Sequence, residues 1–153
     1  MDAATFLTPA TLDNYLSRLH ENTLPEWGKM NALQMLEHLG VGLAFSSNKH
    51  GELTVVTPPD KIARYKQFLY SEMEMQHSLP SPLQGDEPPS PRAVSIAMAR
   101  QYLLEEIDDF NVYFQQHPAA TTVHHIFGKL NYEEWQLFHR KHFLHHFKQF
   151  GIL

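Results

Sequence analysis

The chain contains no cysteine among its 153 residues. This absence excludes disulfide bonds, zinc–thiolate sites and cysteine nucleophiles together. Any bound metal ion must therefore be held by histidine, carboxylate or water. A chain without cysteine fits the cytoplasm, although it is also compatible with export.

Long hydrophobic runs and a strongly basic charge are also missing. No apolar run approaches the roughly 20 residues that a membrane-spanning helix requires. The first residues lack the basic region and apolar core of a signal peptide. The formal net charge of −5 gives no support to binding of nucleic acid or anionic membranes. We therefore expect a cytoplasmic protein with neither nucleic acid nor membrane as a partner.

Several catalytic signatures are absent as well. The sequence has no internal repeat, no glycine-rich phosphate loop and no serine in a nucleophile-elbow pattern. It also lacks the facing pair of Glu-x-x-His motifs that builds a di-iron bundle. What remains is ordinary for a globular protein, with 42% hydrophobic and 19% charged residues. The length predicts a single domain spanning residues 1–153.

Apolar residues recur at helical spacing in four substantial segments and one shorter one. The helices predicted from this pattern cover about residues 9–21, 31–45, 57–70, 90–116 and 131–151. Asn31, Ser90 and Asn131 are the expected caps of three of them, and Glu134 is placed to complete a capping box with Asn131. A proline-rich loop over 73–90 and a connector over 119–130 separate the later helices. We predict an all-α fold, a four-helix bundle with an extra short helix and long loops.

The last predicted helix places two histidines on its apolar face. His142 and His146 are one turn apart, in the middle of a stripe that also collects aromatic residues such as Trp135 and Phe143. Two imidazoles in that position need a partner, and a metal ion is the first candidate. From the helix around 31–45, His38 offers a third imidazole, with Gly42 one turn below it. From spacing alone, core histidines satisfied by hydrogen bonds are an equally good interpretation.

Two stretches resemble motifs of the DinB/YfiT-like superfamily of proposed metalloenzymes. The first is residues 27–39, WGKMNALQMLEHL, and the second is residues 127–151, FGKLNYEEWQLFHRKHFLHHFKQFG. The second is particularly similar to a branch of unknown function with a His-Pro-x-Phe-Gly turn before the last helix. Here His125 stands where that branch has proline. The resemblance implies a DinB-like bundle of the up-down-down-up type with a three-histidine site for a divalent metal, nickel or zinc. Carried over residue by residue, the ligands are His38, His142 and His146.

Some members of the superfamily transfer low-molecular-weight thiols. The resemblance thus implies a metal-dependent thiol S-transferase or hydrolase with a small-molecule substrate, and it assigns neither catalytic nor thiol-binding residues. The alternative is a non-catalytic metal-binding or interaction protein, dimeric through its helices. A third interpretation is a metal-free bundle with a structural trio of histidines.

Other residues receive weaker expectations. His139 and His145 flank the pair and are candidates for supporting the ligands rather than for ligation. His124 and His125 are expected at a turn, with a surface role favoured over one at the mouth of the site. Gln34 lies on the His38 face and could orient the site, while a buried structural role is the alternative.

Overall fold

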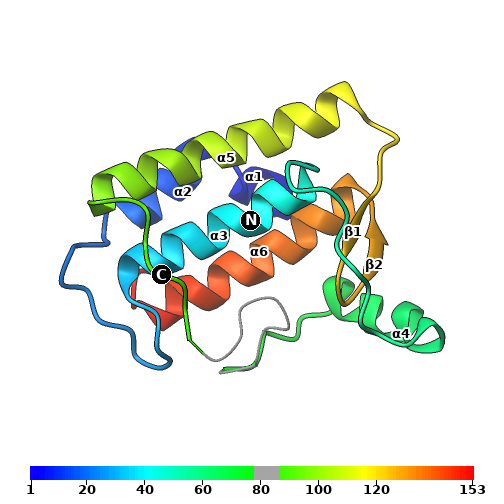
Figure 1. The fold of residues 1–153 in the computed structure, drawn as a ribbon, viewed down its shortest axis with the longest axis horizontal. Helices are drawn as coiled ribbons and strands as arrows, with labels where there is room; N and C mark the ends of the chain where they lie inside the picture. Colours follow the sequence, from blue (N-terminus) through cyan, green and yellow to red (C-terminus); the bar gives the residue numbers. More distant parts are fainter. Residues whose placement is uncertain (78–86) are drawn as a thin grey trace.

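The computed structural model describes residues 1–77 and 87–153. Over these residues the protein is predominantly helical, with one small antiparallel hairpin (Figure 1). The elements in chain order are α1 (Ala3–Phe6), α2 (Pro9–Leu16), α3 (Ala32–Ser46), α4 (Pro59–Tyr70), α5 (Ile96–Gln116), β1 (Thr122–His124), β2 (Gly128–Leu130) and α6 (Tyr132–Gln149). The part of the proline-rich loop over 78–86 lies outside the described residues.

Helices α3, α5 and α6 run side by side along the long axis of the molecule (Figure 1). Helix α3 lies between the other two and contacts both of them. The short helices α1 and α2 cover the core, α1 against α6 and α2 against α5. Helix α4 and the hairpin lie together at one end, where Lys66 Nζ donates to the carbonyl oxygen of Lys129 at 3.0 Å.

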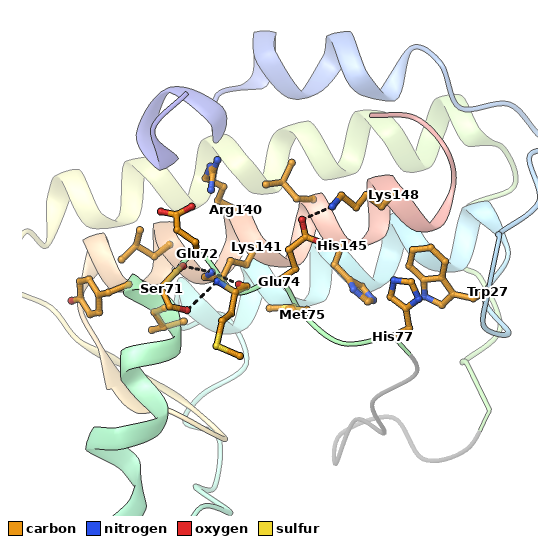
Figure 2. Close-up of a pocket in the computed structure, with 15 residues that line it drawn as sticks. Trp27, Ser71, Glu72, Glu74, Met75, His77, Arg140, Lys141, His145 and Lys148 are labelled. Atoms are coloured by element: carbon orange, nitrogen blue, oxygen red, sulfur yellow. Dashed lines mark hydrogen bonds and ion pairs between the residues drawn. The ribbon is translucent and has the colours of Figure 1, made fainter.

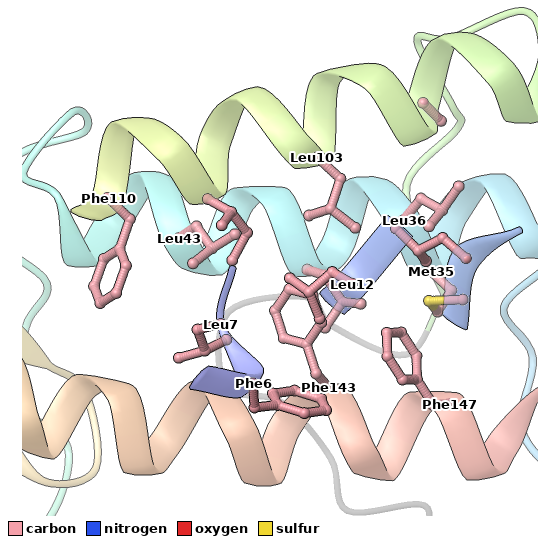
Figure 3. Packing of buried hydrophobic residues seen from close by; sticks show 14 of the residues in the cluster. Phe6, Leu7, Leu12, Met35, Leu36, Leu43, Leu103, Phe110, Phe143 and Phe147 are labelled. Carbon is pink, nitrogen blue, oxygen red and sulfur yellow. The ribbon is translucent and has the colours of Figure 1, made fainter. Parts of the chain in front are cut away.

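Leucine and phenylalanine side chains fill the space between α3, α5 and α6 (Figure 3). Leu36, Leu43 and Leu103 face Phe143 and Phe147 across this space. All five are essentially buried. Burial of one such side chain contributes about 1.5–3 kcal/mol, so this layer fixes how α3 and α6 face each other.

The predicted caps of the two site-bearing helices are confirmed. Asn31 Oδ1 accepts from the backbone N–H of Gln34 at 2.8 Å, and Gln34 Oε1 accepts from that of Asn31 at 2.9 Å. Asn131 and Glu134 form the same reciprocal box at the start of α6. Each box satisfies two backbone donors that have no partner within the helix.

Two predicted helix boundaries are wrong. The helix expected over 9–21 ends at Leu16, because the chain tightens into turns that bury Leu19. The helix expected from Ser90 begins at Ile96 and is capped by Ser95. The reason is tertiary: Glu37 Oε1 accepts from the backbone N–H groups of residues 92 and 93, both at 2.7 Å, and holds this segment on α3.

The expectation of an all-α fold missed the hairpin. Strands β1 and β2 pair antiparallel, with Thr122 opposite Leu130 and His124 opposite Gly128. Gly128 has a φ of +70°, which a glycine adopts without strain. Three-residue strands are too short to give a readable alternation of apolar and polar residues.

In the part of the chain that the structure describes, no helix combines the length and apolarity needed to cross a membrane.

Candidate metal centre

Three histidines from two helices converge between α3 and α6. His38 lies on α3, and His142 and His146 lie one turn apart on α6. The Nε2 atom of His142 is 2.8 Å from that of His38 and 3.2 Å from that of His146. The candidate ligand atoms of all three residues lie within 4.8 Å of one another, so the group could hold a metal ion. We call these residues the histidine cluster.

The orientation of the rings follows from the helices that carry them. The spacing of four residues places His142 and His146 on one side of α6, with ring centroids 4.8 Å apart. The ring of His38 approaches both at steep angles, 83° to His142 and 75° to His146. The short distances from Nε2 of His142 to the other two Nε2 atoms show that the rings turn these nitrogens toward one another.

Gly42 lies beside the cluster, as its spacing from His38 predicts. A Cβ atom added at Gly42 would lie 3.9 Å from Cε1 of His142 and 3.9 Å from Cε1 of His139. These are ordinary van der Waals distances. The absence of a side chain at Gly42 is therefore not what makes room for the three rings.

Burial keeps the histidine cluster neutral. It lowers the pKa of His38 to about 4 and that of His146 to about 3, with charge repulsion from neighbouring histidines as a smaller cause. The pKa of His142 is held well below its ordinary value, first by burial and then by His38 and His146. At neutral pH all three imidazoles are therefore uncharged. Neutral imidazole is the form that binds a metal ion.

The donor set fits a divalent ion. Metal–nitrogen distances of about 2.0–2.1 Å in a tetrahedral site place neighbouring nitrogens about 3.3 Å apart. The observed Nε2 separations of 2.8 and 3.2 Å are close to that value. Three neutral imidazoles without carboxylate or thiolate suit zinc, nickel, copper or iron, and they leave a coordination position for water or a substrate.

One neighbouring histidine is tied to the core instead. His139 is fully buried, its Nε2 lies 2.9 Å from Ser46 Oγ, and its ring stacks on Trp135. The hydroxyl of Ser46 donates to the Leu43 carbonyl at 2.7 Å, so its oxygen accepts from His139 Nε2–H. This desolvated position lowers the pKa of His139 to about 3. His139 is therefore bonded to Ser46 and packed in the core.

Other predicted positions take different places. His124 is buried, and its Nδ1 accepts from the backbone N–H groups of Ile126 and Phe127, so the expected surface role is wrong for this residue. His125 is only partly buried beside it. The Oε1 atom of Gln34 accepts from the cap of α3, and its Nε2 donates to the Pro89 carbonyl at 3.0 Å. Both polar atoms of the Gln34 side chain therefore bond to backbone groups outside the histidine cluster.

A pocket of about 260 Å³ is lined by His145, the neighbour of His146 on α6 (Figure 2). The ring of His145 meets that of His146 edge-on at 4.9 Å and lines the pocket with Trp27 and His77, whose rings stack 3.6 Å apart. Two lysines on the same side of α6 as His145 hold the 71–77 segment: Lys141 donates to backbone carbonyls of this segment, and Lys148 pairs with Glu74. Among the described residues that line the pocket, none belongs to the histidine cluster.

Gln149 is the residue near the site that sequence reasoning missed. It is buried near the end of α6, and its Oε1 lies 2.7 Å from Nδ1 of His146. Its spacing of three residues from His146 is a signal for contact on a helix. That signal is too common to single out one glutamine.

The comparisons with known proteins give one match. A family model described as "Protein of unknown function (DUF1569)" matches residues 7–151, a span that includes the whole histidine cluster. No curated protein and no solved structure matches the chain.

Proposed function

Since the chain belongs to the family of proteins of unknown function DUF1569, we propose its function from the geometry of the site. The protein binds one divalent metal ion, zinc or nickel, through His38, His142 and His146. The observation that carries this proposal is the convergence of three buried, neutral imidazoles, with Nε2 of His142 2.8 Å from that of His38 and 3.2 Å from that of His146. A single cation satisfies three such lone pairs at once.

The proposed fold is a DinB-like four-helix bundle that forms one domain over residues 1–153. Helices α2, α3, α5 and α6 are its four members, and α4 with the hairpin is an addition at one end. The contacts among these helices and the two sequence motifs support this assignment. In DinB-like bundles the metal site is built by the second and last helices, which correspond here to α3 and α6.

The proposed activity is metal-dependent thiol transfer or hydrolysis in the cytoplasm, with a low-molecular-weight thiol or water as the group that reacts. A bound divalent ion lowers the pKa of a coordinated thiol or water and so supplies a nucleophile at neutral pH. The chain's own contribution is to hold three neutral ligands and to keep them apart from bulk water. The pocket beside His145 is a nearby space for a small substrate.

A non-catalytic metal-binding protein, able to dimerise through its helices, is the second candidate. The observation that favours it is the separation between the pocket and the histidine cluster, since no cluster member lines that pocket among the described residues. Catalysis would require a substrate to reach the metal past His145. The cobalt-substituted protein tests this choice. If adding a low-molecular-weight thiol does not change its absorption spectrum, the non-catalytic candidate is favoured over the enzyme.

Metal analysis of protein purified without a histidine tag tests the site. We expect about one zinc or nickel ion per chain in the wild type, and its loss in His142→Ala and His146→Ala. His20→Ala is the matched control, because His20 is exposed and does not belong to the cluster. Stoichiometric metal that survives both substitutions would reject the proposed ligands.

A further inference from the structure

The side chain of Gln149 connects the histidine cluster to a distant loop. Its Oε1 lies 2.7 Å from Nδ1 of His146, and its Nε2 donates to the carbonyl oxygen of Trp27 at 2.8 Å. The backbone carbonyl of Gln149 also accepts from the N–H of Glu26 at 2.7 Å. With 5% of its surface exposed, Gln149 has little water to replace these partners.

The partners of the carboxamide determine its direction. The carbonyl oxygen of Trp27 only accepts hydrogen bonds, so the amide nitrogen of Gln149 must face it. The amide oxygen then faces His146, and this oxygen also only accepts. Nδ1 of His146 must therefore carry a proton. In a neutral imidazole this leaves Nε2 without one, and that Nε2 is the atom 3.2 Å from His142 Nε2.

We infer that Gln149 is a positioning residue that holds His146 as the Nδ1–H tautomer, with its Nε2 lone pair directed at the other two histidines. This inference rests on the proposed metal site. Metal-ligating histidines generally donate their second N–H to an oxygen that fixes the tautomer and raises ligand basicity. Gln149 supplies that oxygen to His146, whereas in the described residues Nδ1 of His142 has no partner.

The loop on the other side is shaped to receive this carboxamide. Gly28 has a φ of +81°, and a Cβ atom added there would lie 2.7 Å from Gln149 Nε2. A side chain at position 28 would therefore displace the amide from its place between Trp27 and His146. The ring of Trp27 lines the pocket and stacks on His77, so Gln149 also ties one wall of the pocket to a metal ligand.

The tautomer is tested on metal-free protein by long-range ¹H–¹⁵N correlation spectra of histidine side chains at neutral pH. In the wild type we expect His146 to show a protonated Nδ1 and an unprotonated Nε2. In Gln149→Leu the tautomers should mix or reverse, because the acceptor is gone. A protonated Nε2 in the wild type would overturn the inference, as would an unchanged His146 signal in Gln149→Leu.

Zinc affinity, measured by competition with a chelator, is the second readout. Gln149→Leu should bind zinc about 10- to 100-fold more weakly than the wild type. Gln149→Glu keeps an acceptor for Nδ1–H and should restore both the tautomer and most of the affinity. The matched control is Gln136→Leu, which removes another buried glutamine of α6 and should bind zinc as the wild type does.

Gly28→Ala probes the same contact without altering Gln149, and it keeps the test decisive if Gln149→Leu does not fold. It should weaken zinc binding and perturb the His146 signals in the same direction. Wild-type affinity and tautomer in Gly28→Ala would count against the inference. Wild-type protein that binds no zinc but shows the Nδ1–H tautomer would reject the proposed metal function and leave the role of Gln149 in place.

Discussion

The Nε2 atoms of His38 and His142 lie 2.8 Å apart, although 104 residues separate them in sequence. Leucine and phenylalanine packing between α3 and α6 brings these atoms together, so the site depends on the core as a whole.

Gly42→Ala should leave metal stoichiometry unchanged. The added methyl group would lie at ordinary contact distance from His139 and His142, so neither ring is displaced. Replacing a glycine inside α3 should also raise the free energy of unfolding by roughly 0.5–1 kcal/mol. Metal analysis and urea unfolding check the two expectations. A loss of metal would mean that the bare backbone at Gly42 is part of the site.

Ser46→Ala should destabilise the protein by about 1–3 kcal/mol. The substitution removes the acceptor of His139 Nε2–H in a position with no access to water. Urea unfolding of the metal-free protein measures the effect. Ser17→Ala is the control, since Ser17 is exposed and bonds only within its own turn. Equal stability of the two variants would show that the bond of Ser46 to His139 contributes nothing.

His139 is one of several buried, neutral histidines that should make the metal-free protein lose stability on acidification. Its pKa of about 3 in the folded state lies below the ordinary value of 6.5, so the unfolded chain takes up the proton first. The contribution is complete above pH 6.5 and is lost as the pH falls toward 3, at up to about 1.4 kcal/mol per pH unit for one group. Urea unfolding at pH 7, 5.5 and 4.5 measures this slope.

His139→Gln should show a shallower dependence on pH than the wild type, while the exposed His20→Ala should follow the wild type. Identical slopes for all three proteins would contradict the assignment of the acid sensitivity to His139.

Asn131→Ala should lower the free energy of unfolding by about 1 kcal/mol without loss of metal. The change removes one half of the capping box at the start of α6, while His142 and His146 lie two or more turns further along the helix. Thermal unfolding and metal analysis of the same sample separate the two effects. Loss of metal together with stability would show that the first turn of α6 sets the ligand geometry.

Features that depend on residues close in sequence could be predicted. The cap of α6 uses residues three apart, and the two histidines of α6 are four apart, so both follow from helix geometry. A helix was also predicted over 57–70 from its proline-containing start, and α4 covers Pro59–Tyr70. His38 was noted from its place one turn above Gly42, and its assignment as the third ligand came from the resemblance to a known family.

Features that depend on distant partners could not be predicted. Gln149 acquires its role through Trp27, 122 residues away, and Glu37 holds the segment before α5 on α3, so that Ser95 rather than Ser90 caps this helix. His124 looked like a turn residue at the surface, but its ring packs against Trp135 and Phe138 of α6 and is buried there. In each case the local sequence allows more than one conformation or environment, and a contact with a distant part of the chain selects one of them.

The most direct test of the account is a crystal structure of the zinc-soaked protein with anomalous data collected at the zinc edge. We predict a single strong peak about 2.0–2.1 Å from the Nε2 atoms of His38, His142 and His146. A peak among Glu74, His77 and His145 in the neighbouring pocket, or no ordered peak at all, would contradict the central claim that these three histidines form a metal site.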